Sequence, residues 1–228
     1  MTKHIDKDYP IPSTQDKFSE ASYFLSKMIE NYHNPWEFQF NLNAFIQAFR
    51  NITFMLQAEP NKPNSFEDWY KSKQEEMKKN ILLKKLVNAR NIVVKQSSLS
   101  SKSKAWSGIF RNRGLKMAFG SEVHPFTDTK KYLKNMQEIM IGTLLDEEHS
   151  AIGEQIGIER SWIVEEIGDT EVVLLCNDAL NYMGELLSEA KSLFGKDEEY
   201  KKIKIDLSTT QVLLETDVDP TLIDKWNW

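Results

Sequence analysis

Residues 35–59, PWEFQFNLNAFIQAFRNITFMLQAE, contain the clearest helical pattern in the chain. Apolar side chains recur there every three or four residues and form one stripe, made of Phe38, Leu42, Phe45, Phe49, Ile52 and Leu56. A second apolar side consists of Phe40, Ala44, Ala48 and Met55. We therefore expect a central helix that begins at Pro35, because proline suits the first turn of a helix.

Further helices are predicted on both sides of this central one. The first starts after Ser13 and Asp16 and runs to about His33. A second begins at Ser65, and a third spans Asn80 to Gln96. A fourth begins at about Asp128 and continues past His149, and a fifth spans Thr170 to Phe194. Aromatic residues around Asn112, Arg113 and Gly114 favour a short β-hairpin between Ala105 and Phe126. The residues after Lys196 mix both patterns and remain unassigned.

A serine-rich stretch suggests where the chain divides. Residues 97–107 hold six serines and two lysines, a composition typical of a linker or an exposed loop. We therefore predict a mainly α fold, with a helical bundle at residues 1–97. Residues 98–228 would form the linker, the short β-hairpin and an acidic, mostly helical carboxy-terminal unit.

The composition narrows the class of protein. Cys176 is the single cysteine, so neither a disulfide within the chain nor a cysteine-based zinc site is expected. The first fifteen residues are polar and lack the apolar core of a signal peptide. No apolar run approaches the roughly 18 residues that a membrane span needs. We expect a soluble, cytoplasmic protein that does not contact a membrane.

Charge is distributed unevenly along the chain. Residues 71–116 hold thirteen Lys and Arg and two acids, a local charge of +11, whereas residues 144–228 have a local charge of −13. Such segregation favours a phosphate-bearing partner for the basic segment. The alternative is that the two segments neutralise each other inside the protein.

A polar constellation is predicted on two of the helices. Arg90 shares a line of four, three and four spacing with Leu83, Val87 and Val94, which would place its guanidinium in the buried stripe. A buried guanidinium needs hydrogen bonds or a charged partner. Polar support could come from the central helix, which carries Asn43, Gln47, Arg50 and Asn51. Such a network can also serve only to fix the register of two helices.

The segment Asn88-Ala89-Arg90-Asn91-Ile92-Val93-Val94-Lys95, after a central helix with Arg50-Asn51, resembles the HEPN superfamily of helical nucleic-acid-associated domains over roughly residues 13–97. That family carries an Arg, a polar residue and then a His near the end of a helix. Arg90 and Asn91 match, but Lys95 stands at the His position. The resemblance implies a metal-independent endoribonuclease site of Arg90, Asn91 and Lys95. Lysine is a poor base, with an ordinary pKa of about 10.4, so we expect little or no cleavage.

Two functions follow from these observations. The first is RNA or other polyanion binding, of a toxin or defence type by resemblance, with nucleic acid contacted by Lys84, Lys85, Lys102, Lys104, Arg111 and Arg113. The second is a structural module that forms a homodimer or binds an unknown protein partner. A di-metal bundle is not expected, because Asp146 and His149 have no second carboxylate-His pair. We expect neither a metal nor a cofactor.

Overall fold

The computed structural model describes residues 10–95, 99, 101–119, 124–140 and 152–225. These residues form two compact units that alternate along the chain. Unit 1 draws on the ranges 1–28, 39–100 and 164–205, and unit 2 on 29–38, 101–163 and 206–228. We predicted a domain boundary between residues 97 and 98, and it stays a prediction. Folding of an isolated fragment of residues 1–97 would test it.

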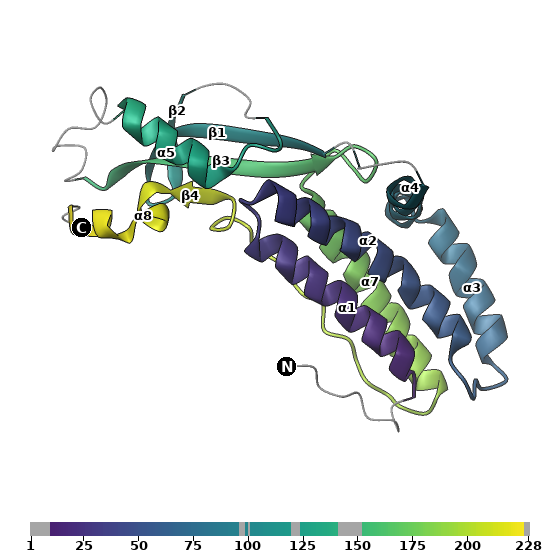
Figure 1. Cartoon of the computed structure of the whole chain (residues 1–228). Coiled ribbons are helices and arrows are strands. Elements are labelled where there is room, and N and C mark those ends of the chain that lie inside the picture. Colours follow the sequence, from purple (N-terminus) through teal and green to yellow (C-terminus); the bar gives the residue numbers. More distant parts are fainter. Residues whose placement is uncertain (1–9, 96–98, 100, 120–123, 141–151, 226–228) are drawn as a thin grey trace. The chain divides into compact units, whose positions relative to one another are not determined.

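Unit 1 is built from helices (Figure 1). They are α1 (Pro12–Glu30), α2 (Pro35–Ala58), α3 (Phe66–Lys79), α4 (Ile81–Lys95) and α7 (Val172–Leu193), with the end of α1 and the start of α2 belonging to unit 2. The predicted stripe of α2 is buried from Phe38 to Leu56, so the central helix is confirmed. Phe40, which we placed on a second apolar side, is instead 62% exposed.

Two sets of polar contacts hold the helices of unit 1 to residues outside them. The backbone N–H and hydroxyl of Thr14 both donate to Oε1 of buried Glu59, at 2.6 and 2.8 Å, and so tie the start of α1 to the residue after α2. Asn181 of α7 exchanges two hydrogen bonds of 2.9 Å with the backbone of Ile203. The irregular segment that follows α7 is thereby held against that helix.

Unit 2 is organised around a four-stranded sheet with strand order β2-β1-β3-β4. The strands are β1 (Ser101–Arg111), β2 (Gly114–Phe119), β3 (Glu154–Val164) and β4 (Val212–Leu214). β1 pairs antiparallel with β2, and β3 pairs antiparallel with β4. Helices α5 (Thr129–Met140) and α8 (Glu215–Val218) and the 3-10 helix η1 (Pro220–Lys225) complete the unit. The helix predicted past Met140 lies outside the described residues.

The predicted hairpin is confirmed as β1 and β2. Asn112 and Arg113 form its turn with φ angles of 50° and 61°, and Arg111 faces Gly114 across it. Two consecutive residues with positive φ give the turn a twist that matches the flanking strands.

The mainly α expectation is wrong, and so is a mostly helical carboxy-terminal unit. The chain is mixed α/β, because β1 and β3 are long strands that the sequence interpretation either shortened or missed. In β3, the buried residues Ile156, Ile158 and Trp162 follow the two-residue period of a strand. Ile156 and Ile158 pack with Leu133 of α5, so this face of the sheet forms the core of unit 2.

The connection between α1 and α2 belongs to unit 2 and is hydrogen-bonded to strand β3. The indole Nε1 of Trp162 donates to the carbonyl of Tyr32 at 2.9 Å, and the Tyr32 hydroxyl donates to the carbonyl of Arg160 at 3.1 Å. The Trp162 ring also stacks on Phe38, with centroids 4.5 Å apart. None of the helices in the described ranges is long and apolar enough to cross a membrane.

Candidate functional site

The polar residues predicted on α2 lie on its flank and not in a buried constellation. Gln47 is exposed, whereas Asn43, Arg50 and Asn51 are half-buried. The Gln47 amide donates to the carbonyl of Asn43 at 3.2 Å, within its own helix. These side chains therefore remain partly open to solvent or to a ligand.

Helix α4 is rotated relative to the stripe that we predicted. Leu83, Leu86 and Ala89 are the buried residues, whereas Arg90 is half-buried and Val94 is 50% exposed. The expectation that Arg90 lies inside the buried stripe is wrong, because the core uses residues three apart and leaves Arg90 at the edge. Its Nη1 lies 3.5 Å from Oδ1 of Asn91, a long contact. Lys95 is exposed at the end of the helix.

A pocket of about 560 Å³ opens in unit 1 and takes in part of the predicted set. Arg50 and Lys84 are among its lining residues, and further polar lining comes from Thr53, Gln57, Gln74, Lys78 and Asn88. Helices α2, α3, α4 and α7 all contribute. We call this the Arg50 pocket.

The geometry of Arg50 makes it the best-placed cation of the pocket. Its guanidinium lies over the ring of Phe54, 4.2 Å from the centroid, and its Nη1 donates to the hydroxyl of Thr53 at 2.8 Å. These contacts hold the group in position while using one of its several N–H donors. The remaining donors suit an anionic ligand.

The surroundings of Arg50 carry positive charge. Burial lowers the pKa of Arg50 from its ordinary value, and the charge of Arg90 lowers it further, while Tyr70 opposes the shift. A guanidinium stays protonated at neutral pH despite such a shift. Among the described residues that line the pocket there is no carboxylate, so the positive potential is not neutralised from within. The arrangement can bind an anion.

The same residues do not form an evident catalytic group. Lys95, expected to stand for the family histidine, is not among the lining residues of the pocket, and neither are Arg90 and Asn91. Within the described ranges, no group of three or more His, Cys, Asp and Glu is placed to hold a metal ion.

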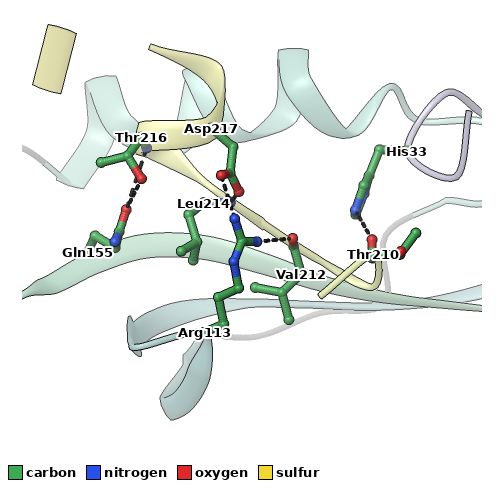
Figure 2. A network of polar contacts seen from close by, with 8 residues as sticks. All are labelled: His33, Arg113, Gln155, Thr210, Val212, Leu214, Thr216 and Asp217. Carbon is green, nitrogen blue, oxygen red and sulfur yellow. Dashed lines mark hydrogen bonds and ion pairs between the residues drawn. The ribbon is translucent and has the colours of Figure 1, made fainter. Parts of the chain in front are cut away.

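The predicted nucleic-acid contacts fall in different units. Lys84 and Lys85 belong to unit 1, whereas Lys102, Lys104, Arg111 and Arg113 belong to unit 2. Arg111 pairs with Glu154 at 2.5 Å. Arg113 pairs with Asp217 at 2.5 Å and also donates to the carbonyl of Val212 (Figure 2). These two arginines are used to hold unit 2 together.

Ion pairs within each unit also bear on the charge segregation. Lys73 of the basic segment pairs with Glu189 of the acidic segment at 2.9 Å in unit 1, as Arg111 and Arg113 pair with acids in unit 2. Neutralisation inside the protein, the alternative left open by the sequence, thus accounts for at least these three basic residues of the described ranges. Lys84 of the basic segment takes no part in these three ion pairs.

Unit 2 has a polar pocket of its own, of about 510 Å³. His33 lies in it and donates from Nε2 to the carbonyl of Thr210, 2.8 Å away (Figure 2). Burial lowers the pKa of His33 to about 4, so its ring is neutral at pH 7. Carboxylates and cations both line this pocket, among them Asp128, Asp217 and Lys130. It lacks the uniform charge of the Arg50 pocket.

The sequence interpretation missed several lining residues of the Arg50 pocket. Thr53 and Gln57 follow Arg50 by three and seven residues, so helical spacing alone places them on its face. Tyr70 and Gln74 of α3 are likewise four residues apart. What the spacing could not supply was the identity of the helix that faces this side of α2.

Comparisons with known proteins identify the family of the chain. The family model described as bacteriophage lambda protein ea47 matches residues 3–220. Protein ea47 of Escherichia phage lambda is 32% identical over 90 residues, which cover 39% of this chain and 22% of that protein. The match therefore spans about a fifth of the relative's length. No solved structure matches.

These findings correct the resemblance drawn from the Arg90 segment. Nothing in the comparisons points to the HEPN superfamily, whose signature is short and was incomplete at Lys95. The HEPN, all-α and ribonuclease-like descriptions therefore fall away, and the RNA-binding description loses its support. Because its model matches nearly the whole chain, this protein belongs to the family of the bacteriophage lambda protein ea47.

Proposed function

We propose that this protein binds a phosphate-bearing polyanion without cleaving it, and that the Arg50 pocket is the binding site. The observation that carries the proposal is the charge of this pocket. Arg50, Lys78 and Lys84 line it, Arg90 adds positive potential, and no carboxylate is among its described lining residues. Lys78 is paired with Glu75 at 2.7 Å, so Arg50 and Lys84 are the principal contacts.

Partial burial makes such a site effective. An anion held beside a half-buried guanidinium meets a lower dielectric constant than one on an open surface, and salt screens the interaction less. The pre-positioning of Arg50 by Phe54 and Thr53 also reduces the entropy lost on binding. A homodimer stays a prediction of the sequence.

The test is binding of inorganic polyphosphate, measured by isothermal titration calorimetry at low and moderate salt. Lys84→Gln removes one exposed cation from the pocket, and Lys79→Gln removes an equally exposed cation that does not line it. We expect Lys84→Gln and Arg50→Gln to weaken binding several-fold and to reduce its salt dependence, and Lys79→Gln to have little effect. Circular dichroism checks that each variant is folded.

Two results would contradict the proposal. One is the absence of polyphosphate binding by the intact protein at low salt. The other is an equal loss for Lys84→Gln and Lys79→Gln, which would mean that only overall charge matters.

A further inference from the structure

The Arg50 pocket has an apolar floor that a simple polyanion would leave unused. Its apolar lining comes from Phe49, Met77, Leu83, Val87 and Met183. Phe49 and Met183 are 4% and 3% exposed, whereas Met77 and Val87 are half-buried, so part of this apolar lining is open to solvent. Covering this surface with an apolar group would be favourable, at roughly 25 cal/mol per Å² removed from water.

Three amide side chains are among the lining residues, and they limit which apolar group a ligand could place in the pocket. Gln57, Gln74 and Asn88 each carry one acceptor and two donor hydrogens. The Gln57 amide donates to the carbonyl of Thr53 at 2.9 Å, and the side chains of Gln57 and Gln74 also hydrogen-bond with Tyr70. A ligand that buried these amides without hydrogen bonding to them would bind poorly. A flat ring with donors and acceptors at its edge meets this demand, and an acyl chain does not.

The cations define the other end of the ligand. Arg50 and Lys84 come from different helices, α2 and α4, and both line the pocket. Two cations with the added potential of Arg90 suit a dianionic phosphate ester better than a single carboxylate. A volume of about 560 Å³ falls within the range of pockets that hold small organic ligands.

We infer that the Arg50 pocket binds a nucleoside phosphate unit, with the base over the apolar floor and the phosphate at Arg50 and Lys84. This inference rests on the proposed function and specifies its ligand. The unit could be a free nucleotide or the phosphorylated end of a nucleic-acid strand, because both present the same base, sugar and phosphate.

The test compares ligands of matched charge on the full-length protein by isothermal titration calorimetry. The probes are the four nucleoside triphosphates, inorganic tripolyphosphate, and a short alkyl triphosphate. We expect at least one nucleoside triphosphate to bind about tenfold or more tightly than tripolyphosphate, because the base adds contacts with the floor and the amides. A 5′-phosphorylated tetranucleotide of the preferred base then separates the two sources, since tighter binding of the strand indicates a strand end.

Variants separate the two ends of the ligand. Val87→Phe fills part of the floor and should lower the affinity for nucleotides by a larger factor than the affinity for tripolyphosphate. Asn88→Ala, at an exposed position, should alter the preference among the four bases. Lys84→Gln should weaken every anion, and Lys79→Gln should weaken none of them.

The outcomes distinguish failure of the nucleotide inference from failure of the proposed polyanion binding. Equal affinity for nucleotides and tripolyphosphate, or tighter binding of the alkyl triphosphate, overturns the inference and leaves the proposed function in place. No binding of any probe, polyphosphate included, overturns both. Loss of nucleotide binding in Asn88→Ala or Val87→Phe, with tripolyphosphate binding retained, supports the inference even if one of the other variants fails to fold.

Discussion

The contact between His33 and Thr210 predicts a dependence of stability on pH in the acid range. Burial is the main cause that lowers the pKa of His33 to about 4, and the charges of Arg160 and Lys130 act in the same direction. The hydrogen bond to Thr210 and the charge of Asp217 act in the opposite direction but are outweighed. In the unfolded chain the pKa of this histidine returns to about 6.5.

The sign follows from proton binding. Above pH 6.5 the ring is neutral in both states, and His33 contributes no pH dependence. As the pH falls from 6.5 towards 4, the unfolded chain takes up a proton that the folded protein refuses, so stability is lost. With pKa values of about 4 and 6.5, the loss at pH 5 is about 2 kcal/mol relative to pH 8, and about 3 kcal/mol below pH 4.

The measurement is urea unfolding of the wild-type protein and of His33→Gln at pH 8 and pH 5. The glutamine Nε2 can donate to the carbonyl of Thr210 as the histidine does, but it does not titrate. Carboxylates contribute equally to both proteins and cancel in the difference. We expect the wild type to lose about 2 kcal/mol more than the variant between the two pH values. A stability difference between the two proteins that is constant from pH 8 to pH 5 would refute the reasoning.

Three further predictions concern the fold. Trp162→Phe removes the N–H donor to the carbonyl of Tyr32 and should cost about 1–3 kcal/mol in urea unfolding, so a loss close to zero would contradict the role of this bond. Gly157→Ala would bring a methyl group to 2.7 Å from Cδ2 of Leu214, and we expect a lower melting temperature from overpacking of about 1–3 kcal/mol, whereas an unchanged melting temperature would show that the strands adjust freely. A fragment of residues 1–97 lacks α7, which packs within unit 1, and we expect circular dichroism and urea titration to show no cooperative unfolding; a cooperative transition would establish it as a separate domain.

The helices were predictable because their stripes are long and regular. The stripe from Val172 to Ala190 is buried as its spacing predicts, and Gly195, with a φ angle of 80°, follows the end of that helix. Local spacing decides such elements, since each turn repeats the same pattern. The hairpin turn was equally local, because Asn112 tolerates a positive φ angle better than most residues do.

The sheet was harder to predict because its pairing is not local. β3 contains Arg160 between buried apolar residues, and this charge hides the two-residue period of the strand. The burial of Arg160 depends on an acceptor from Thr127, which its Nη2 reaches at 2.9 Å, and on the ring of Trp162. A single sequence does not reveal such partners in advance.

Only part of the candidate site was predictable from the sequence, namely two of its cations. Arg50 and Lys84 were identified from their charge and their place on helices, and both line the pocket. The choice of Arg90 as a buried centre failed because helical spacing allowed two faces of α4 to be the buried one. Packing selected the face with Leu86 and Ala89.

The order in which unit 2 receives its parts has a consequence for synthesis on the ribosome. Its segments are separated by long stretches of unit 1, and strand β4 pairs with β3 although residues 165–211 lie between the two strands in the chain. Strand β3 is therefore synthesised well before its partner. Until β4 has followed, the strand edge of β3 that will accept it stays open to chaperones or to aggregation.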